Sequence, residues 1–158
     1  MLLEKVFVED RMKIKHLYSY DSNGDRIASA ISNSGSKHLS WFFKHDSAGN
    51  RIEEKEFDDS ANVSTTSYNY DVNGNRVEET VKRLKISLRK RVNGYDEKGN
   101  IEEATEYIDS TVIKKESYTY EFDSVGNWIK RIASSLTNKS GKALSEPMSV
   151  TYRTITYY

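Results

Sequence analysis

The stretch Tyr68-Asn69-Tyr70-Asp71-Val72-Asn73-Gly74-Asn75-Arg76-Val77 decides the fold of this chain, because its pattern occurs five times. In each copy an aspartate follows a hydrophobic, usually aromatic stretch, and a glycine stands three residues after the aspartate. The pairs are Asp21 with Gly24, Asp46 with Gly49, Asp71 with Gly74, Asp96 with Gly99, and Asp123 with Gly126. Successive aspartates are 25 residues apart three times and 27 apart once, which indicates a repeat protein.

The spacing from aspartate to glycine predicts a turn. An aspartate that opens a type I turn accepts a hydrogen bond from the backbone N–H two residues later, and a glycine in the fourth position adopts the left-handed conformation that closes a bulged hairpin. Before the turn, rings alternate with polar residues, as in Tyr68-Asn69-Tyr70. After it, Arg76-Val77 starts the returning strand. Each repeat therefore predicts one β-hairpin.

A period of about 25 residues accommodates two strands and two short connections. Strands are also expected at Val6 to Val8 and Met12 to Tyr20, and a closing strand at Ser149 to Tyr158, with Pro147 marking its start. The predicted fold class is all-β: an antiparallel meander of about twelve strands, built from tandem hairpins in a curved or rolled sheet. We expect one domain over residues 1–158.

The composition gives little material for a core, since Leu, Ile, Val and Phe together make up only about a fifth of the residues. Eleven tyrosines compensate, because an aromatic ring buries a large area while keeping a polar edge. We therefore expect a core built largely from tyrosine. The formal net charge is zero, which argues against a nucleic-acid partner. The start of the chain, Met1 to Lys5, shows no apolar segment of the length that membrane insertion or a signal peptide requires.

The combination of an aromatic-x-aromatic strand, Asp-x-x-Gly-Asn and Arg-Ile or Arg-Val resembles the YD repeat of the RHS family. The segment from Tyr120 to Arg131 also resembles the terminal repeat of small bacterial YD-repeat proteins. The likeness covers roughly residues 12 to 158. It implies hairpins in spiralling β-sheets and an extracellular, cell-surface or periplasmic location. Copy four departs from the pattern, because the arginine is missing after Asn100 and Ile101 follows directly.

The sequence contains few residues in a pattern that would indicate a catalytic or metal site. There is no cysteine, and the three histidines are scattered. Asp21, Asn23 and Asp25 have the alternate spacing of a calcium loop, but other copies break that spacing, so turn formation explains it better. Adjacent glutamates such as Glu53-Glu54 point to opposite faces of a strand and cannot form a catalytic pair. We expect no cofactor, no metal and no enzymatic activity.

A basic run from Lys82 to Arg91 is the exception to the neutral charge pattern. It suits an anionic partner, but cross-strand pairing with the glutamate pairs of neighbouring strands explains it more simply. Within the run, Leu84, Ile86 and Leu88 alternate with Lys85 and Ser87, as in a half-buried strand.

Two kinds of surface remain as candidate sites. Exposed rings stack on sugars, and the candidates for such a polysaccharide platform are Trp41, Trp128, Tyr20 and Tyr70. Alternatively the last strand pairs with a partner or a second copy through its free edge, which is formed by Arg153, Thr154, Ile155, Thr156, Tyr157 and Tyr158.

The sequence thus favours a non-enzymatic interaction or assembly module that binds a protein partner or itself, with export inferred from the resemblance alone. A carbohydrate-binding domain that uses aromatic ladders is the alternative. A third hypothesis is an accessory subunit of a larger membrane or surface complex.

Overall fold

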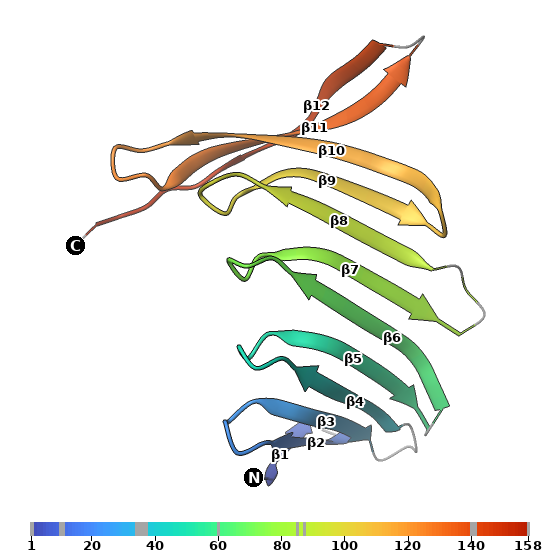
Figure 1. Cartoon of the computed structure of the whole chain (residues 1–158). Coiled ribbons are helices and arrows are strands. Elements are labelled where there is room, and N and C mark those ends of the chain that lie inside the picture. The colour runs from blue at the N-terminus through green and yellow to red at the C-terminus, as the bar shows by residue number, and fades with distance from the viewer. Residues whose placement is uncertain are drawn as a thin grey trace. The chain divides into compact units, whose positions relative to one another are not determined.

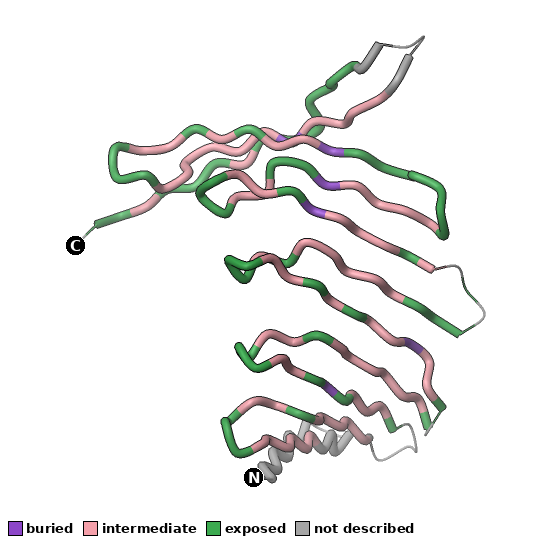
Figure 2. The backbone as a smooth tube through the Cα atoms, viewed as in Figure 1, coloured by how far each residue is buried: buried purple, intermediate pink, exposed green. Residues whose placement is uncertain are grey.

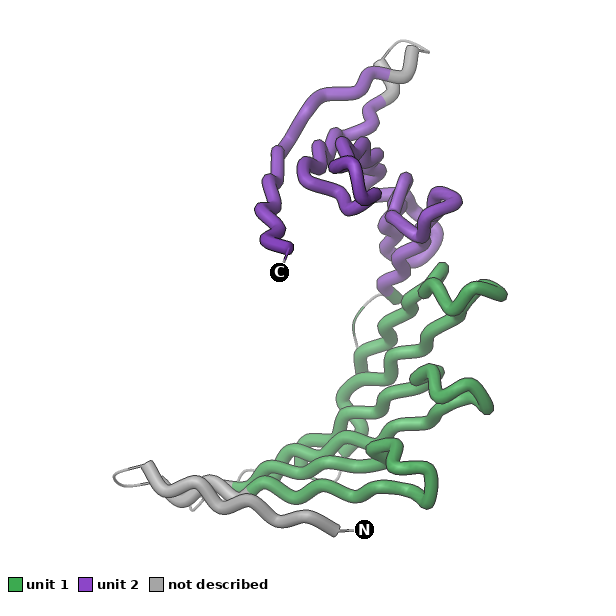
Figure 3. Tube along the Cα trace, turned by 90° about the vertical axis from the view of Figure 1, so that its left-hand side faces the viewer, with its two compact units in different colours: residues 1–88 green, residues 89–158 purple. Residues whose placement is uncertain are grey.

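The computed structural model describes residues 2–9, 12–33, 38–59, 61–84, 86, 88–139 and 142–157. The chain divides into two compact units, Met1–Leu88 (unit 1) and Arg89–Tyr158 (unit 2), and each is considered by itself (Figure 3). The expectation of a single domain over 1–158 stays a prediction.

The described residues form twelve strands and no helix (Figure 1). Unit 1 holds β1 (Leu2–Glu9), β2 (Met12–Tyr20), β3 (Arg26–Asn33), β4 (His38–His45), β5 (Arg51–Asp58), β6 (Ala61–Tyr70) and β7 (Arg76–Arg83). Unit 2 holds β8 (Arg89–Tyr95), β9 (Ile101–Ile108), β10 (Thr111–Phe122), β11 (Trp128–Lys139) and β12 (Lys142–Tyr152). Within each unit, strands that follow one another in the chain pair antiparallel. The predicted all-β antiparallel meander of hairpins is confirmed.

Each repeat hairpin contains a bulge just beyond its turn. In the second hairpin Lys44 pairs with Glu53 and His45 pairs with Arg51, so Ile52 has no partner in β4. The third hairpin leaves Val77 without a partner in the same way, because Asn69 pairs with Glu78 and Tyr70 with Arg76. A bulge of this kind reverses the alternation of faces along the strand.

The register separates the side chains of unit 1 onto two faces, because paired residues point to the same side of a sheet. One face, here called the aromatic face, carries Tyr18 opposite Ser29, which in turn lies opposite Trp41. Phe43 and Tyr68 follow on β4 and β6. The opposite face carries Phe42 and Phe57, together with many small and charged residues.

Few of the residues whose burial is described are buried, as Figure 2 shows in purple. Among the described residues the buried hydrophobic ones are Phe43, Ala104 and Ala133, and the described tyrosines are all half-buried or exposed. The prediction of a tyrosine core is therefore wrong. The described strands of unit 1 form one layer (Figure 3), so we infer that their rings pack mainly against neighbouring side chains of the same face.

Two further expectations about strands are wrong. The closing strand β12 runs from Lys142 to Tyr152, so it begins before Ser149 and ends before Arg153. Pro147 lies inside it, opposite Ser134 and beside an irregularity of the register, a position that tolerates a residue without an N–H. Leu84 and Ile86 lie in the connection after β7 and are 59% and 64% exposed, because the backbone turns there, with Ile86 N–H donating to Arg83 O at 3.3 Å.

Candidate functional site

The five turns are built alike, and the turn at 71–75 shows the pattern. The Asp71 carboxylate accepts backbone N–H groups through Oδ1, from Asn73 at 2.9 Å and from Asn75 at 2.8 Å. Gly74 has φ of +82° and donates its N–H to Asp71 O at 3.1 Å. The equivalent bonds recur in the other four turns. The predicted turn chemistry is thus present in every copy.

The residue that follows the glycine adds a contact that the sequence analysis missed. Its backbone N–H binds the aspartate in all five turns, and in three of them its side-chain amide does so too. The amides of Asn50, Asn75 and Asn100 donate to Oδ2 of their aspartates at 3.1, 3.0 and 2.9 Å. The preference for asparagine in this position was visible in the sequence, and these bonds account for it.

These bonds favour the ionised carboxylate. The side-chain amide of Asn50 lowers the pKa of Asp46, and that of Asn75 lowers the pKa of Asp71. At Asp96 burial acts to raise the pKa, but hydrogen bonds from Asn100 outweigh it, and the net pKa is lowered. The carboxylates of Asp46, Asp71 and Asp96 are therefore held as charged acceptors by their own loops.

The calcium hypothesis for Asp21, Asn23 and Asp25 gains nothing from the geometry. Asp21 Oδ1 already accepts the N–H groups of Asn23 and Asp25, both at 2.9 Å. Within the described residues no group of three or more histidines, cysteines, aspartates or glutamates is arranged to hold a metal ion.

A ladder of arginines and rings covers the aromatic face of unit 1. The Arg26 guanidinium lies over the rings of Tyr18 and Phe43, with its Cζ 5.7 and 5.0 Å from their centroids. Arg51 lies 4.2 Å from the Phe43 centroid, and Arg76 lies 5.3 Å from that of Tyr68. Guanidinium groups at such distances attract the ring faces. The rings of Tyr18, Phe43 and Tyr68 are thus engaged by the protein's own arginines.

The bulges make this ladder possible. Arg51 and Glu54 are three residues apart on one strand, a spacing that normally places side chains on opposite faces. The bulge at Ile52 puts them on the same face, and Arg51 Nη1 binds Glu54 Oε2 at 2.8 Å. Arg76 and Glu79 repeat the arrangement at 3.1 Å. Arg51 and Arg76 are therefore each fixed between a ring and a carboxylate.

Of the predicted aromatic candidates in unit 1, Tyr70 has the clearest role. Its hydroxyl donates to Arg51 O at 2.8 Å, which ties β6 to β5. Tyr20 and Trp41 are half-buried, and Trp41 shares its face with Phe43 and lies opposite Glu56. Ligand binding by Tyr20, Trp41 or Tyr70 stays a prediction.

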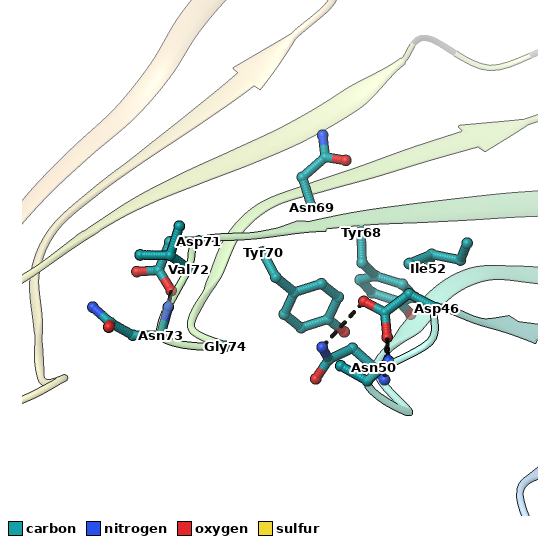
Figure 4. Close-up of a pocket in the computed structure, with 11 residues that line it drawn as sticks. Asp46, Asn50, Ile52, Tyr68, Asn69, Tyr70, Asp71, Val72, Asn73 and Gly74 are labelled. Carbon is teal, nitrogen blue, oxygen red and sulfur yellow. Dashed lines mark hydrogen bonds between the residues drawn. The ribbon is translucent and has the colours of Figure 1, made fainter. Parts of the chain in front are cut away.

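A shallow hollow of about 510 Å³ lies between the turns at 46–50 and 71–75. Figure 4 shows Tyr70 and Tyr68 beside Asp46 and Asn50, with the Asp71 turn next to them. The turn aspartates in its lining are already bound by Asn50 and Asn75. The hollow therefore offers ring edges and backbone more than free carboxylates.

The opposite face of unit 1 bears an apolar patch. Phe42 is 51% exposed, and its ring meets that of Phe57 edge-on at 5.5 Å. Ala28 pairs with Phe42, and Ser40 pairs with both Ala30 and Phe57. Phe42, Phe57, Ala28, Ala30 and Ser40 are named the phenylalanine patch. Glu53 borders it and binds Lys44 at 2.9 Å and Lys55 at 3.5 Å.

Unit 2 carries a charged cluster on β8, β9 and β10. Arg91 Nη1 binds Glu106 Oε1 at 2.7 Å and lies 3.9 Å from Glu116 Oε2. Glu116 has only 8% of its side chain exposed, and it accepts from Tyr118 Oη at 3.2 Å and from Lys114 Nζ at 3.0 Å. This buried cluster was not predicted. Arg91, Glu106 and Glu116 come from three different strands and lie 10 to 25 residues apart in the sequence, so the strand register brings them together.

The glutamate pairs behave as expected for a strand, with Glu53 bound on one face and Glu54 on the other. Glu53 binds Lys44, Glu54 binds Arg51 and Glu79 binds Arg76. From the basic run between Lys82 and Arg91, Arg91 binds Glu106. Glu53, Glu54 and Glu79 are therefore bound by bases outside the basic run, and the pairing expected between that run and the glutamate pairs stays a prediction.

Trp128 lies at the start of β11 in unit 2. Its ring meets Tyr120 at 6.3 Å, and the guanidinium of Arg153 lies 4.2 Å from its centroid. Arg153 to Tyr157 form no strand, although Arg153 N–H donates to Ile129 O at 2.9 Å. The self-association role of residues 153–158 stays a prediction, and Tyr158 lies outside the described residues.

Neither the family models nor the curated proteins compared with this chain match it. Among solved structures, a porin-like protein from Bacteroides uniformis is similar over 96% of this chain and 94% of its own, with 10% identity and a TM-score of 0.38. A likeness of this degree carries no argument about function. The described residues contain no helix long and apolar enough to cross a membrane.

Proposed function

We propose that this protein is a non-enzymatic assembly module in which copies of the chain associate through the phenylalanine patch. One observation carries the proposal: Phe42 is 51% exposed, while its neighbour Phe43 is 7% exposed. Because side chains alternate between the two faces along β4, Phe42 and Phe43 lie on opposite faces, and the ring of Phe42 is the exposed one. An exposed apolar group of this kind, surrounded by polar residues, marks a protein interaction site.

The residues around the patch suit a second copy as the occupant. Ala28, Ala30 and Ser40 place small side chains next to the two rings, on β3 and between Phe57 and Ala30. Lys44, Glu53 and Lys55 place both signs of charge at its border. A two-fold axis through the patch brings lysines of one copy towards glutamates of the other, which is the self-complementarity that a symmetric dimer needs.

The proposal includes membership of the YD-repeat family and an exported or surface-associated location. The family rests on the five turn motifs, in each of which the aspartate accepts the backbone N–H of the residue after the glycine. The location rests on the resemblance alone.

A carbohydrate platform on the aromatic face of unit 1 is the weaker reading. Sugar rings stack on open aromatic faces, but Tyr18, Phe43 and Tyr68 already hold guanidinium groups. A sugar would have to displace these arginines, two of which also bind glutamates.

Light scattering coupled to size exclusion tests the assembly. The wild-type chain is expected at the mass of a dimer or larger species, and Phe42→Asp at the mass of a monomer. Val72→Asp is the matched control, because Val72 is fully exposed in a turn outside the patch and its replacement should leave the mass unchanged. A wild-type monomer at the highest soluble concentration, or an unchanged mass for Phe42→Asp, would contradict the proposal.

A further inference from the structure

The segment Arg153–Tyr157, here called the tail, folds back on the fifth turn of its own unit. Arg153 N–H donates to Ile129 O at 2.9 Å, where the tail leaves β12. Four residues further on, the Tyr157 hydroxyl reaches the turn at 123–127. Tyr157 is nevertheless 56% exposed, and Ile155 is the one residue of the tail that is half-buried. The tail is therefore held by a few contacts at its ends.

The Tyr157 contact changes the fifth turn relative to three of the others. In turns two to four the asparagine amide donates directly to Oδ2 of the aspartate, at 3.1, 3.0 and 2.9 Å. In the fifth turn Asn127 Nδ2 donates to Tyr157 Oη at 2.7 Å, and that hydroxyl donates to Asp123 Oδ2 at 2.5 Å. One hydroxyl group thus stands between an amide donor and a carboxylate acceptor.

The other end of the tail covers an aromatic ring. Arg153 lies 4.2 Å from the Trp128 centroid, while Tyr120 meets the same indole at an interplanar angle of 63° and thus supports it by an edge contact. In turns one to three the position of Trp128, five residues after the aspartate, is an arginine. The fifth hairpin is therefore the repeat that offers a tryptophan beside the turn carboxylate and amide.

We propose that Trp128, Asp123 and Asn127 form a binding site for a neutral sugar, and that the tail occupies this site when no sugar is bound. A sugar hydroxyl donates and accepts hydrogen bonds as the Tyr157 hydroxyl does, so it satisfies Asp123 Oδ2 and Asn127 Nδ2 together. The apolar face of a pyranose ring stacks on indole in the place where Arg153 lies.

This site goes beyond the proposed assembly function, since it lies in unit 2 and uses none of the residues of the phenylalanine patch. It also makes sugar affinity depend on the tail. A sugar must first displace Arg153 and Tyr157, so the apparent affinity of the wild-type chain is reduced by the fraction of molecules whose tail is docked.

Calorimetric titration with maltohexaose, cellohexaose, chitohexaose and mannohexaose tests the site. The full-length Arg153→Ala/Tyr157→Phe variant removes the side-chain contacts of the tail with Trp128, Asp123 and Asn127 and leaves these three residues unchanged. We expect it to bind at least one of the four sugars at least tenfold more tightly than the wild-type chain. Adding Trp128→Ala should abolish that binding, whereas adding Trp41→Phe should preserve it and leave Trp128 as the single fluorescent reporter.

Failure of all four sugars to bind the tail variant, a gain below tenfold, or binding that survives Trp128→Ala would overturn the proposal. Circular dichroism checks that each variant is folded. Amide hydrogen exchange on the unmodified chain gives a second measurement: at saturating sugar the Arg153 N–H should exchange at least tenfold faster, and an unchanged rate would count against displacement of the tail. Phe42→Asp should not alter sugar binding, which separates this site from the assembly function.

Discussion

Hairpins two and three in unit 1 and hairpin four in unit 2 share the same turn but differ on the face beside it. Three residues before the aspartate, the first two carry Phe43 and Tyr68, whereas hairpin four carries Asn93. Five residues after it, they carry Arg51 and Arg76, whereas hairpin four carries Ile101. The ring and the arginine are thus lost together, as expected if the stacking contact is what keeps both.

Hairpin four replaces the stacked pair with buried polar contacts. Asn93 is 7% exposed and accepts from Arg91 Nε at 3.0 Å, and Ala104 is 2% exposed opposite Glu116. The small Ala104 side chain, which stands where hairpin two has Glu54, leaves room for the carboxylate that β10 contributes. The same turn is therefore compatible with two kinds of contact on the face beside it, namely cation–π stacking in unit 1 and a charge cluster in unit 2.

Removing the centre of the charge cluster should have the largest effect. Glu116→Ala leaves Lys114 and Tyr118 without their carboxylate and Arg91 with Glu106 alone. Because Glu116 is buried and its hydrogen bonds to charged groups are lost, we expect the free energy of unfolding to fall by about 2 kcal/mol, measured by urea denaturation.

The matched control is Glu53→Ala in unit 1, which also removes a glutamate that holds two lysines, but at a more exposed site. Its loss should cost less than about 1 kcal/mol. Equal losses for the two variants would show that burial of Glu116 does not distinguish the units.

The turn shared by all hairpins should respond to a change of its glycine. Gly74 has φ of +82°, so Gly74→Ala forces an L-residue into the left-handed region although no atom blocks the added Cβ. We expect a loss of about 1–2 kcal/mol in the free energy of unfolding. Gly94→Ala is the control, since its surroundings are equally open and its φ is not positive. It should be neutral or stabilising, and a comparable loss there would contradict the backbone explanation.

The turns and hairpins were predictable because each depends on residues within five positions of one another. Asp71, Gly74 and their alternating neighbours encode the turn and the strand locally.

The placement of Arg51 was not predicted, because simple alternation assigns it and Glu54 to opposite faces and the bulge at Ile52 reverses this. The sequence did contain one signal, namely that arginine and ring disappear together in copy four. Of the site under the tail, only Trp128 was predicted as a sugar-stacking residue. Its grouping with Asp123 was not predicted, since Tyr157 was expected in a strand and its contact with Asp123 spans 34 residues.

The stacking contact itself should be measurable as a coupling energy. In a double-mutant cycle of Phe43→Leu and Arg51→Met, we expect the pair to contribute about 0.5–1 kcal/mol beyond the two single changes. A second cycle with Phe43→Leu and Lys44→Met tests neighbours on opposite faces and should give a coupling near zero. If both cycles give the same value, the ladder is not a stabilising feature of unit 1.

The smallest effect concerns the pH dependence of the turns. The Asn75 amide lowers the pKa of Asp71 in the folded chain, below the unfolded value of about 3.9. The stabilisation is therefore complete above the unfolded pKa and is lost as the pH falls through the folded one. Asn75→Ala should reduce the difference in unfolding free energy between pH 7 and pH 3. Asn73→Ala, in the same turn, should leave that difference unchanged, because Asn73 binds Asp71 through its backbone N–H. The fifth turn should differ from the third, because the hydrogen bond from Tyr157 is the chief cause that lowers the pKa of Asp123. In that turn Tyr157→Phe should therefore reduce the difference in unfolding free energy between pH 7 and pH 3.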